Sequence, residues 1–378
     1  MLVFPLTAAL AATTPCGEPL SAEGPTVHLV TVGPAATIDK SFGHTSVYVQ
    51  DPSAGIDTVY NYGFYSGYGP DAIRDFVLGD QRYWLQTRAW KVEIGKYRGE
   101  ARSLTVQRLD LSPAAAATLV STLAYMDDDS RRHYDYHWYA SNCTTKIRDL
   151  LDAAIDGALR AQLAGPSGTT QRFEVLRHIH TVPWAWYGLS WGASARTDVE
   201  LSRYEAAFLP STLHDELGRL SLDGRPLVSR ECEVLSSELP PPLPAPPNRA
   251  PLLAGIGAVW GGLVAAAPRR LSAVLLALHA TLATLAGVVS VGLWALSNTE
   301  AYWANSHLFL SSPAHVVGVL AAWWIARGDR RATPALGGLL ALGLVGVVAG
   351  LALGKPTVGW AAFFLLPLLG GVARAQRD

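Results

Sequence analysis

Charge is scarce in this chain, and the charge that is present does not cluster. Only 16% of the 378 residues are Asp, Glu, Lys or Arg, whereas 49% are hydrophobic, and the formal net charge is -1. A surface that binds nucleic acid needs clustered Lys and Arg, so the sequence argues against a nucleic-acid partner. A composition this apolar is unusual for a soluble protein and predicts that part of the chain lies in a membrane.

Cysteine is almost absent, with three residues, and the ten histidines do not occur in HExxH or CxxC spacing. The sequence therefore predicts no metal site and no cofactor. Cys16 and Cys232 lie near the two ends of the polar part of the chain. We expect them to form a disulfide in an oxidising compartment and Cys143 to remain free.

The hydrophobicity divides the chain into two domains. Residues 12–238 mix polar, aromatic and charged positions as a globular domain does, whereas residues 251–378 contain long stretches without charge. Between them, residues 239–250 include six prolines, which favour polyproline II and predict a semi-rigid linker. The first 11 residues are apolar and end in Ala9-Leu10-Ala11, so they are either a signal peptide or an apolar first strand.

Five apolar segments predict a unit of five transmembrane helices, because crossing a bilayer takes about 20 apolar residues. Arginines follow the first, third and fifth segments, whereas the loops on the other side carry only Lys355. By the positive-inside rule the arginine-bearing loops are cytoplasmic, which places residues 12–238 outside the cytoplasm. The five segments are 251–268, 271–296, 313–326, 335–353 and 357–373.

Residue patterns within 12–238 predict an α+β fold. Runs rich in β-branched and aromatic residues indicate strands, and capping residues before apolar periodicity indicate helices. The expected strands are 26–33, 44–51, 57–63, 82–94 and 103–111, and the expected helices are 70–80, 112–126 and one that begins near residue 143.

Cys143 is expected in the first turn of that last helix. Ser141 or Asn142 is a suitable N-cap, and apolar residues recur every three or four positions from Ile147 to Ile155. A helix N-terminus carries partial positive charge and free N–H groups, which lower the pKa of a thiol and stabilise an oxyanion. From this feature alone, Cys143 is either a nucleophile or a buried structural residue.

His44 is the histidine that the sequence singles out as a possible base for this thiol. It follows Gly43 and begins an expected strand, so its ring can project from the strand's start toward the end of a facing helix. A lone histidine in this position is more often a hydrogen-bonded structural residue. The combination with a cysteine at a helix start makes His44 a catalytic candidate.

Five segments occur in the chain in a characteristic order: SFGHTSVYVQDP (41–52), VYNYGFYS (59–66), DFVLGDQRYWL (75–85), YHWYASNCTTKIRDLL (136–151) and RYEAAFLPSTLHDEL (203–217). This order resembles the Lnb family of bacterial lipoprotein N-acyltransferases, whose periplasmic domain carries a Phe-Gly-His-Thr and an Asn-Cys-Thr-Thr segment. A more distant likeness relates the histidine-then-cysteine order to permuted papain-like enzymes of the NlpC superfamily. The resemblance implies a permuted papain-like (NlpC-like) extracytoplasmic domain with a Cys-His acyltransferase core.

The resemblance makes Cys143 the nucleophile and His44 the base. Asn61 or Tyr62, on the strand expected beside that of His44, would orient the imidazole, although Asn61 suits a turn equally well. His28 is a fallback for this third role.

Backbone N–H groups near Cys143, Thr144 and Thr145 would form the oxyanion site, and Asn142 would support it. Ser41 and Thr45 flank His44 in the sequence. The side chains of Asn142, Ser41 and Thr45 are also suitable as ordinary caps or turn formers.

Two further segments are candidates for contact with substrate. The aromatic run 181–192 includes Trp184, Trp186 and Trp191, which would either rest on lipid, line an acyl groove or form a small aromatic core. The loop 297–312 is expected on the same side of the membrane as residues 12–238, and its Asn305 and His307 are candidates for binding a lipid headgroup or the acceptor.

The reaction implied by the resemblance is a ping-pong acyl transfer at the bacterial inner (cytoplasmic) membrane, with the catalytic domain in the periplasm. A phospholipid would donate an acyl chain to Cys143, and the α-amine of an apolipoprotein's diacylglyceryl-cysteine would accept it. Two alternatives remain open at this point. The same residues would also serve a membrane-tethered NlpC-type cell-wall peptidase or other thiol hydrolase, and Cys143 could be structural in a non-catalytic scaffold.

Overall fold

The computed structural model describes residues 13–20, 24–35, 37–66 and 69–377. The chain forms two compact units. The N-terminal unit comprises Met1–Ile73, Asp80–Thr169 and Glu200–Leu243, and the membrane unit comprises Arg74–Gly79, Thr170–Val199 and Pro244–Asp378. The expected signal peptide at residues 1–11 lies outside the described residues.

This division differs from the one expected from composition, which assigned all of residues 12–238 to one domain. Arg74–Gly79 and Thr170–Val199 are polar enough to be part of a globular domain, yet they group with the apolar helices. Composition averages over a segment and cannot show which tertiary neighbours a short aromatic helix will have.

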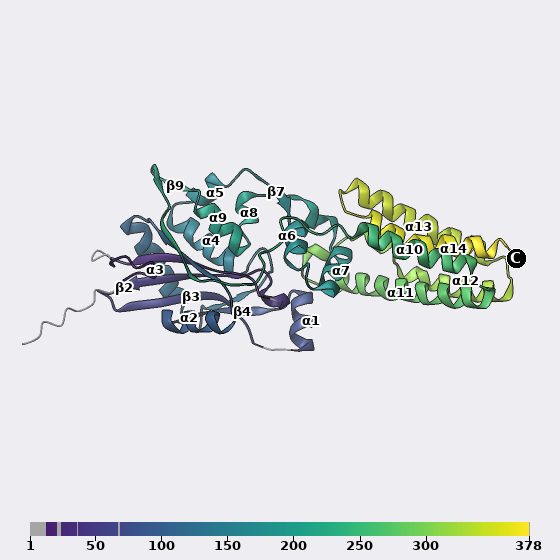
Figure 1. Ribbon diagram of the computed structural model, residues 1–378, viewed down its shortest axis with the longest axis horizontal. Helices are drawn as coiled ribbons and strands as arrows, with labels where there is room; N and C mark the ends of the chain where they lie inside the picture. Colours follow the sequence, from purple (N-terminus) through teal and green to yellow (C-terminus); the bar gives the residue numbers. More distant parts are fainter. Residues whose placement is uncertain (1–12, 21–23, 36, 67–68, 378) are drawn as a thin grey trace, which may run out of the picture. The chain divides into compact units, whose positions relative to one another are not determined.

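A seven-stranded antiparallel sheet forms the centre of the N-terminal unit (Figure 1). Its strands follow the order β11-β5-β1-β2-β3-β4-β6, and each neighbouring pair is antiparallel. The strands are β1 (Thr26–Val32), β2 (His44–Asp51), β3 (Ile56–Phe64), β4 (Arg82–Arg88), β5 (Leu104–Leu109), β6 (His133–Asp135) and β11 (Val228–Leu235). Two-stranded sheets pair β7 (Pro166–Thr170) with β8 (Glu200–Ser202) and β9 (Ser221–Leu222) with β10 (Arg225–Pro226).

Both faces of the large sheet are buried, because successive side chains of a strand point to opposite faces. Leu29, Val47 and Tyr60 belong to one apolar core, and Val30 and Tyr48 belong to another. Helices α3 (Pro113–Met126) and α4 (Cys143–Ala154) contribute to the first core, and α2 (Trp90–Gly99) contributes to the second. The remaining helices of this unit are α5 (Ala158–Gln162), α8 (Arg203–Ala206) and α9 (Pro210–Leu217), with a 3₁₀ turn η1 (Ile38–Lys40).

One expected strand is only half correct. Residues 82–88 form β4, but Trp90–Gly99 form helix α2 instead of continuing the strand expected over 82–94. The alternation of Lys91, Val92, Glu93 and Ile94 has the period of a strand. The residues that α2 buries are Glu93 and Tyr97, which are spaced four apart, as one face of a helix requires.

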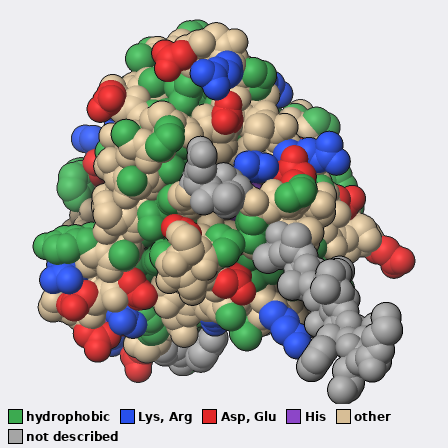
Figure 2. All heavy atoms as spheres, turned by 90° about the vertical axis from the view of Figure 1, so that its left-hand side faces the viewer, with side chains coloured by type: hydrophobic (Ala, Val, Ile, Leu, Met, Phe, Trp, Pro, Cys, Tyr) green, Lys and Arg blue, Asp and Glu red, His purple; other side chains and the backbone are tan. Residues whose placement is uncertain are grey.

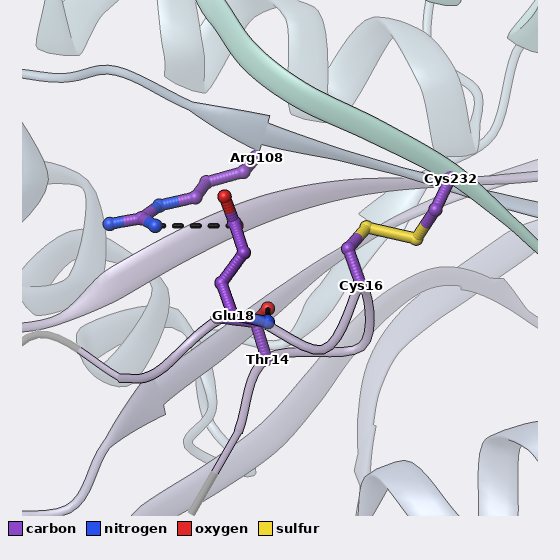
Figure 3. Close-up of a disulfide and its surroundings, with 5 residues drawn as sticks. All are labelled: Thr14, Cys16, Glu18, Arg108 and Cys232. Atoms are coloured by element: carbon purple, nitrogen blue, oxygen red, sulfur yellow. Dashed lines mark hydrogen bonds and ion pairs between the residues drawn. A yellow bond between two sulfur atoms is a disulfide. The ribbon is translucent and has the colours of Figure 1, made fainter.

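A disulfide joins Cys16 to Cys232 of β11, the pair expected from the sequence (Figure 3). The segment around Cys16 is a tight turn in which the Glu18 N–H donates to Thr14 Oγ1 at 3.1 Å. The carboxylate of Glu18 also contacts Arg108 of β5 at 3.3 Å. The cross-link and the ion pair together hold this segment against the β5 and β11 side of the sheet.

Removal of this cross-link should destabilise the N-terminal unit. The disulfide closes a loop with a sequence separation of 216, and losing a native disulfide costs about 2–5 kcal/mol, largely because the unfolded chain gains freedom. We expect Cys16→Ser/Cys232→Ser to lower the free energy of unfolding by this amount in denaturant titrations of the full chain. Mass spectrometry of denatured, unreduced protein should detect one alkylated cysteine, and three would contradict the pairing.

Among the described residues, four helices of the membrane unit are long and apolar enough to cross a membrane, so the expected number of five is not confirmed. The spans are Arg269–Leu296, Glu300–Arg327, Ala332–Ala352 and Val358–Ala375. The first expected segment forms α10 (Ala250–Ala266), an apolar helix of 17 residues that is shorter than these spans. The helices are α10, α11 (Arg269–Leu296), α12 (Val316–Arg327), α13 (Ala332–Ala352) and α14 (Val358–Ala375), with 3₁₀ turns η3 (Glu300–Tyr302), η4 (Ser306–Phe309) and η5 (Pro313–His315) before α12 (Figure 1).

The polar segments of the membrane unit are fastened to these helices by specific hydrogen bonds. At the end of α1 (Pro70–Leu78), the carbonyl of Val77 accepts from Ser297 Oγ at 2.8 Å, directly after α11. Ser190 Oγ accepts from Trp360 Nε1 of α14 at 3.2 Å. These bonds attach the end of α1 and helix α7 (Pro183–Gly192) to the apolar helices, and α6 (Gln171–His178) and η2 (Ala195–Asp198) belong to the same unit.

Candidate active site

Cys143 is the first residue of α4, where a complete set of capping interactions fixes the helix start. The Asn142 side chain accepts hydrogen bonds from the N–H groups of Thr144 and Thr145, both at 2.9 Å. Thr145 Oγ1 in turn accepts from the Asn142 N–H at 2.8 Å, which completes a capping box. Since Ile147 and Leu151 of the same helix are buried in the core, the position of the thiol is set by both the cap and the packing.

His44 is the first residue of β2, and a neighbouring strand holds its ring. Asn61 Oδ1 of β3 lies 3.0 Å from His44 Nε2, and Asn61 is fully buried. An amide oxygen can only accept, so Nε2 carries the proton of the neutral ring. The other nitrogen, Nδ1, is therefore the atom that can take up a proton, as a general base must.

Gly63 brings the histidine and the cysteine to one place. A Cβ atom at this glycine would lie 3.4 Å from Cys143 Cβ and 3.8 Å from His44 Cε1. Gly63 lies at an irregularity in the β3–β4 pairing and has φ of +106°, which L side chains rarely adopt. The absence of a side chain leaves the space between the thiol and the imidazole open.

Both members of the pair are neutral at rest. Burial, together with the positive charges of Lys96, Arg102 and Arg88, lowers the pKa of His44 to about 3. Burial raises the pKa of the Cys143 thiol above its ordinary value, although the backbone N–H groups of Thr45 and Thr144 act in the opposite direction. The site thus holds a thiol and a neutral imidazole, rather than a thiolate and an imidazolium.

The alkylation of Cys143 should therefore depend steeply on pH. Below the raised pKa of the thiol, the thiolate fraction increases about tenfold per pH unit, so the iodoacetamide rate should rise throughout pH 6–9 without a plateau. The rate at pH 7 should also be lower than that of a small free thiol such as N-acetylcysteine, measured alongside. A plateau that begins below pH 7 would indicate a preformed thiolate and contradict this assignment.

Four tyrosines that were not predicted from the sequence lie near the thiol. Burial raises the pKa of Tyr83, Tyr97, Tyr134 and Tyr136, and proximity to the charge of a Cys143 thiolate raises it further in each case. The rings of Tyr83 and Tyr136 stack at 4.0 Å between centroids. The aromatic run that directly precedes Cys143 was the available sequence signal, because two of these tyrosines lie in it.

The structure alters the expected oxyanion site. The N–H groups of Thr144 and Thr145 are occupied by Asn142 Oδ1, and the Asn142 amide donates to the carbonyls of Trp138 and Phe208 at 2.9 and 3.1 Å. These groups therefore cap α4. Next to the thiol, the backbone N–H groups of Cys143 and Thr45 remain as candidate donors.

The other residues expected near His44 have different surroundings. Tyr62 packs into the core on the opposite face of the sheet from His44, with its ring 5.7 Å from that of Tyr134. His28 is fully buried and stacks on Tyr48 at 5.6 Å. Ser41 Oγ donates to the carbonyl of Thr37 at 3.0 Å in the turn before β2. Of the three candidates for the orienting role, Asn61 is the one that contacts His44.

The candidate substrate contacts all lie in the membrane unit. Trp184 is 69% exposed, whereas Trp186 is buried and Trp191 Nε1 donates to Ser311 Oγ at 3.1 Å. Asn305 and His307 are buried and bond the backbone carbonyl of Trp191 at 3.0 and 3.1 Å. Within the described residues, no cluster of three or more His, Cys, Asp or Glu side chains could hold a metal ion.

These features define a membrane protein with an α+β unit that pairs a helix-start cysteine with a strand-borne histidine. The family model for the Lnb N-terminal periplasmic domain matches residues 19–176, which include His44, Asn61 and Cys143. Residues 19–176 therefore match the Lnb N-terminal periplasmic domain, and the resemblance to the Lnb family seen in the motifs is confirmed for these residues. No curated protein and no solved structure matches the chain.

Proposed function

We propose that this protein is a lipoprotein N-acyltransferase that carries an acyl chain on Cys143. The donor is a membrane phospholipid, and the acceptor is the α-amine of the diacylglyceryl-cysteine of an apolipoprotein. The observation that carries the proposal is the meeting of Cys143 and His44 at Gly63, with Asn61 bound to the histidine, inside a domain of the Lnb family.

The first half-reaction forms a thioester. His44 Nδ1 takes the proton of the Cys143 thiol as the sulfur attacks the carbonyl carbon of a phospholipid ester. The backbone N–H groups of Cys143 and Thr45 stabilise the oxyanion. Collapse of the tetrahedral intermediate breaks the ester C–O bond, and His44 gives its proton to the departing alkoxide. The products are an acyl-Cys143 thioester and a lysophospholipid.

The second half-reaction transfers the chain to nitrogen. The neutral α-amine of the acceptor attacks the thioester carbonyl, and His44 takes up the proton that the amine loses. The C–S bond then breaks, the thiolate recovers the proton from His44, and an amide remains. Because both catalytic groups begin and end neutral, the resting site needs no external proton source or cofactor.

The site and its unit favour a lipid substrate over a soluble one. The periplasmic domain and the four apolar helices indicate a membrane protein with a periplasmic part, and we assign it to the bacterial inner membrane. Aromatic rings around the thiol provide an apolar lining that is compatible with an acyl chain. We also assign the N-terminal unit to the permuted papain-like class, supported by a histidine that begins a strand and a cysteine that begins a helix.

Mass spectrometry of lipoprotein N-termini tests the proposal. Cells that contain the protein should carry N-acylated lipoproteins, and cells that lack it should accumulate the diacyl form with a free amine. In purified protein incubated with phospholipid, Cys143 should gain the mass of one acyl group, and hydroxylamine should release it. Cleaved muropeptides together with unchanged lipoproteins would instead support a cell-wall peptidase.

A further inference from the structure

A group of basic side chains lies on one side of His44 and has too few carboxylates to neutralise it. Three of its four cations contact two carboxylates: Lys40 and Arg102 both contact Glu100, at 2.9 and 3.3 Å, and Arg88 contacts Glu93 at 3.5 Å. On the face shown in Figure 2, by contrast, Lys and Arg side chains are interspersed with Asp and Glu. The fourth cation of the group, Lys96, has no carboxylate within ion-pair distance among the described residues.

Lys96 is held between aromatic rings instead of acids. Its Nζ lies 4.6 Å from the centre of the Tyr97 ring and 5.6 Å from that of Phe64, and it donates to Tyr97 Oη at 3.4 Å. The side chain is only partly exposed, and this burial lowers its pKa. Glu93 and Glu100 favour the charged form of Lys96 only from beyond ion-pair distance, and a half-buried cation without a close counter-ion is costly unless a ligand supplies the negative charge.

A second donor in the same group is also unused. Arg102 is buried, and its Nη2 has no hydrogen-bond partner among the described residues. Its guanidinium lies 5.2 Å from the Tyr97 ring, the same ring that Lys96 faces. Arg88 stacks on Phe64 at 4.6 Å and so joins Lys96 at a second ring. The three cations therefore gather at two aromatic rings, Tyr97 and Phe64, and Lys96 is the one that faces both.

These two rings adjoin the catalytic pair. The Tyr97 ring lies 6.4 Å from the ring of His44, and Phe64 directly follows Gly63, which separates His44 from Cys143. In a phospholipid, only the glycerol backbone and its ester oxygens separate the phosphate from the acyl carbonyl groups. An anion bound here would thus be attached to an ester within reach of the thiol.

We propose that Lys96, together with Arg88 and Arg102, binds the phosphate group of the lipid acyl donor and so positions its ester at Cys143. This inference rests on the proposed acyl transfer. It predicts that Lys96 makes the protein prefer acyl donors that carry a phosphate group. A lipid without phosphate would leave the charge of Lys96 unpaired.

The test compares two donors that differ only in the phosphate headgroup. Thioester formation on Cys143 is measured for the full chain in detergent with phosphatidylglycerol and with diacylglycerol of the same acyl chains. Lys96→Gln should lower the ratio of the two kcat/KM values roughly 10- to 100-fold, the usual range for losing a charge-assisted hydrogen bond. The ratio of the two kcat/KM values does not change when part of the protein is unfolded, because both donors are affected equally. The assay is run at pH 8, where His44 is neutral in the wild type and in Lys96→Gln.

Lys91→Gln is the matched control, since Lys91 is an exposed cation on the same helix α2. It should leave the donor ratio at the wild-type value. An unchanged ratio in Lys96→Gln would overturn the inference while leaving the proposed function standing, whereas absence of a thioester with either donor in the wild type would refute the proposed function itself. Inorganic phosphate should compete only with phosphatidylglycerol, and equal inhibition of both donors would show a site for free anions instead.

Discussion

Cys143→Ser should abolish N-acylation of lipoproteins. A serine hydroxyl is far less acidic than a thiol and is a weaker nucleophile in a site that is built around a cysteine. Losing a nucleophile typically lowers kcat by roughly 10⁴-fold or more. The substitution removes no hydrogen bond that caps α4, because Asn142 and Thr145 make those contacts. Mass spectrometry should therefore find diacyl lipoproteins with free amines in cells that contain only this variant, at normal levels of the membrane-inserted protein.

His44→Ala should have a similar but smaller effect, roughly 10²- to 10⁴-fold, the usual contribution of a general base. His133→Ala is the matched control, because His133 is exposed on β6 and should leave acylation intact. Fully triacylated lipoproteins in cells with only Cys143→Ser would exclude Cys143 as the acyl carrier. They would leave the cysteine with a structural role.

Gly63→Leu should inactivate the protein without removing any reacting group. The new side chain would extend from a Cβ that lies 3.4 Å from Cys143 Cβ and 3.8 Å from His44 Cε1, and so would occupy the space between nucleophile and base. Displacements of about 1 Å between reacting groups cost roughly 100-fold in rate. We expect at least this loss in thioester formation, measured by the acyl mass on Cys143.

The control for backbone strain is Gly55→Leu. Gly55 also has a positive φ, +67°, but a Cβ there meets no atom within 4 Å. Both variants carry the strain of a left-handed residue, whereas only the Gly63 variant obstructs the site. Equal activity in Gly63→Leu and Gly55→Leu would show that proton transfer between Cys143 and His44 does not depend on the open space at Gly63.

The sequence was most informative where a pattern is local. Strands β1, β2 and β3 and helices α3 and α4 follow from alternation, capping residues and helical periodicity, all of which are set by neighbours in the chain. Helix α2 was missed because four residues with strand-like alternation concealed the Glu93–Tyr97 spacing. A fifth transmembrane helix was expected because residues 251–268 are apolar throughout. The helix in this segment, α10, ends at Ala266 and is shorter than the four spans.

The candidate site could be predicted only in part, for the same reason. Cys143 and His44 were identifiable from a helix start and a strand start, and Asn61 from its position on the neighbouring strand. The role of Gly63 and the excess charge at Lys96 depend on distances between segments that lie up to 80 residues apart in the chain, as Gly63 and Cys143 do. The oxyanion assignment failed at Thr144 and Thr145 because a good N-cap uses the N–H groups that a helix start otherwise leaves free.

The neutral resting state of Cys143 also has a consequence for chemical durability. Peroxides attack thiolates and convert them to sulfenic acid, and further oxidation to the sulfonic acid is irreversible. A protonated, partly buried thiol avoids this loss in the compartment where Cys16 and Cys232 are oxidised to a disulfide. The same chain can thus keep one cysteine reduced and two oxidised, because the raised pKa of Cys143 leaves little of it as thiolate at rest.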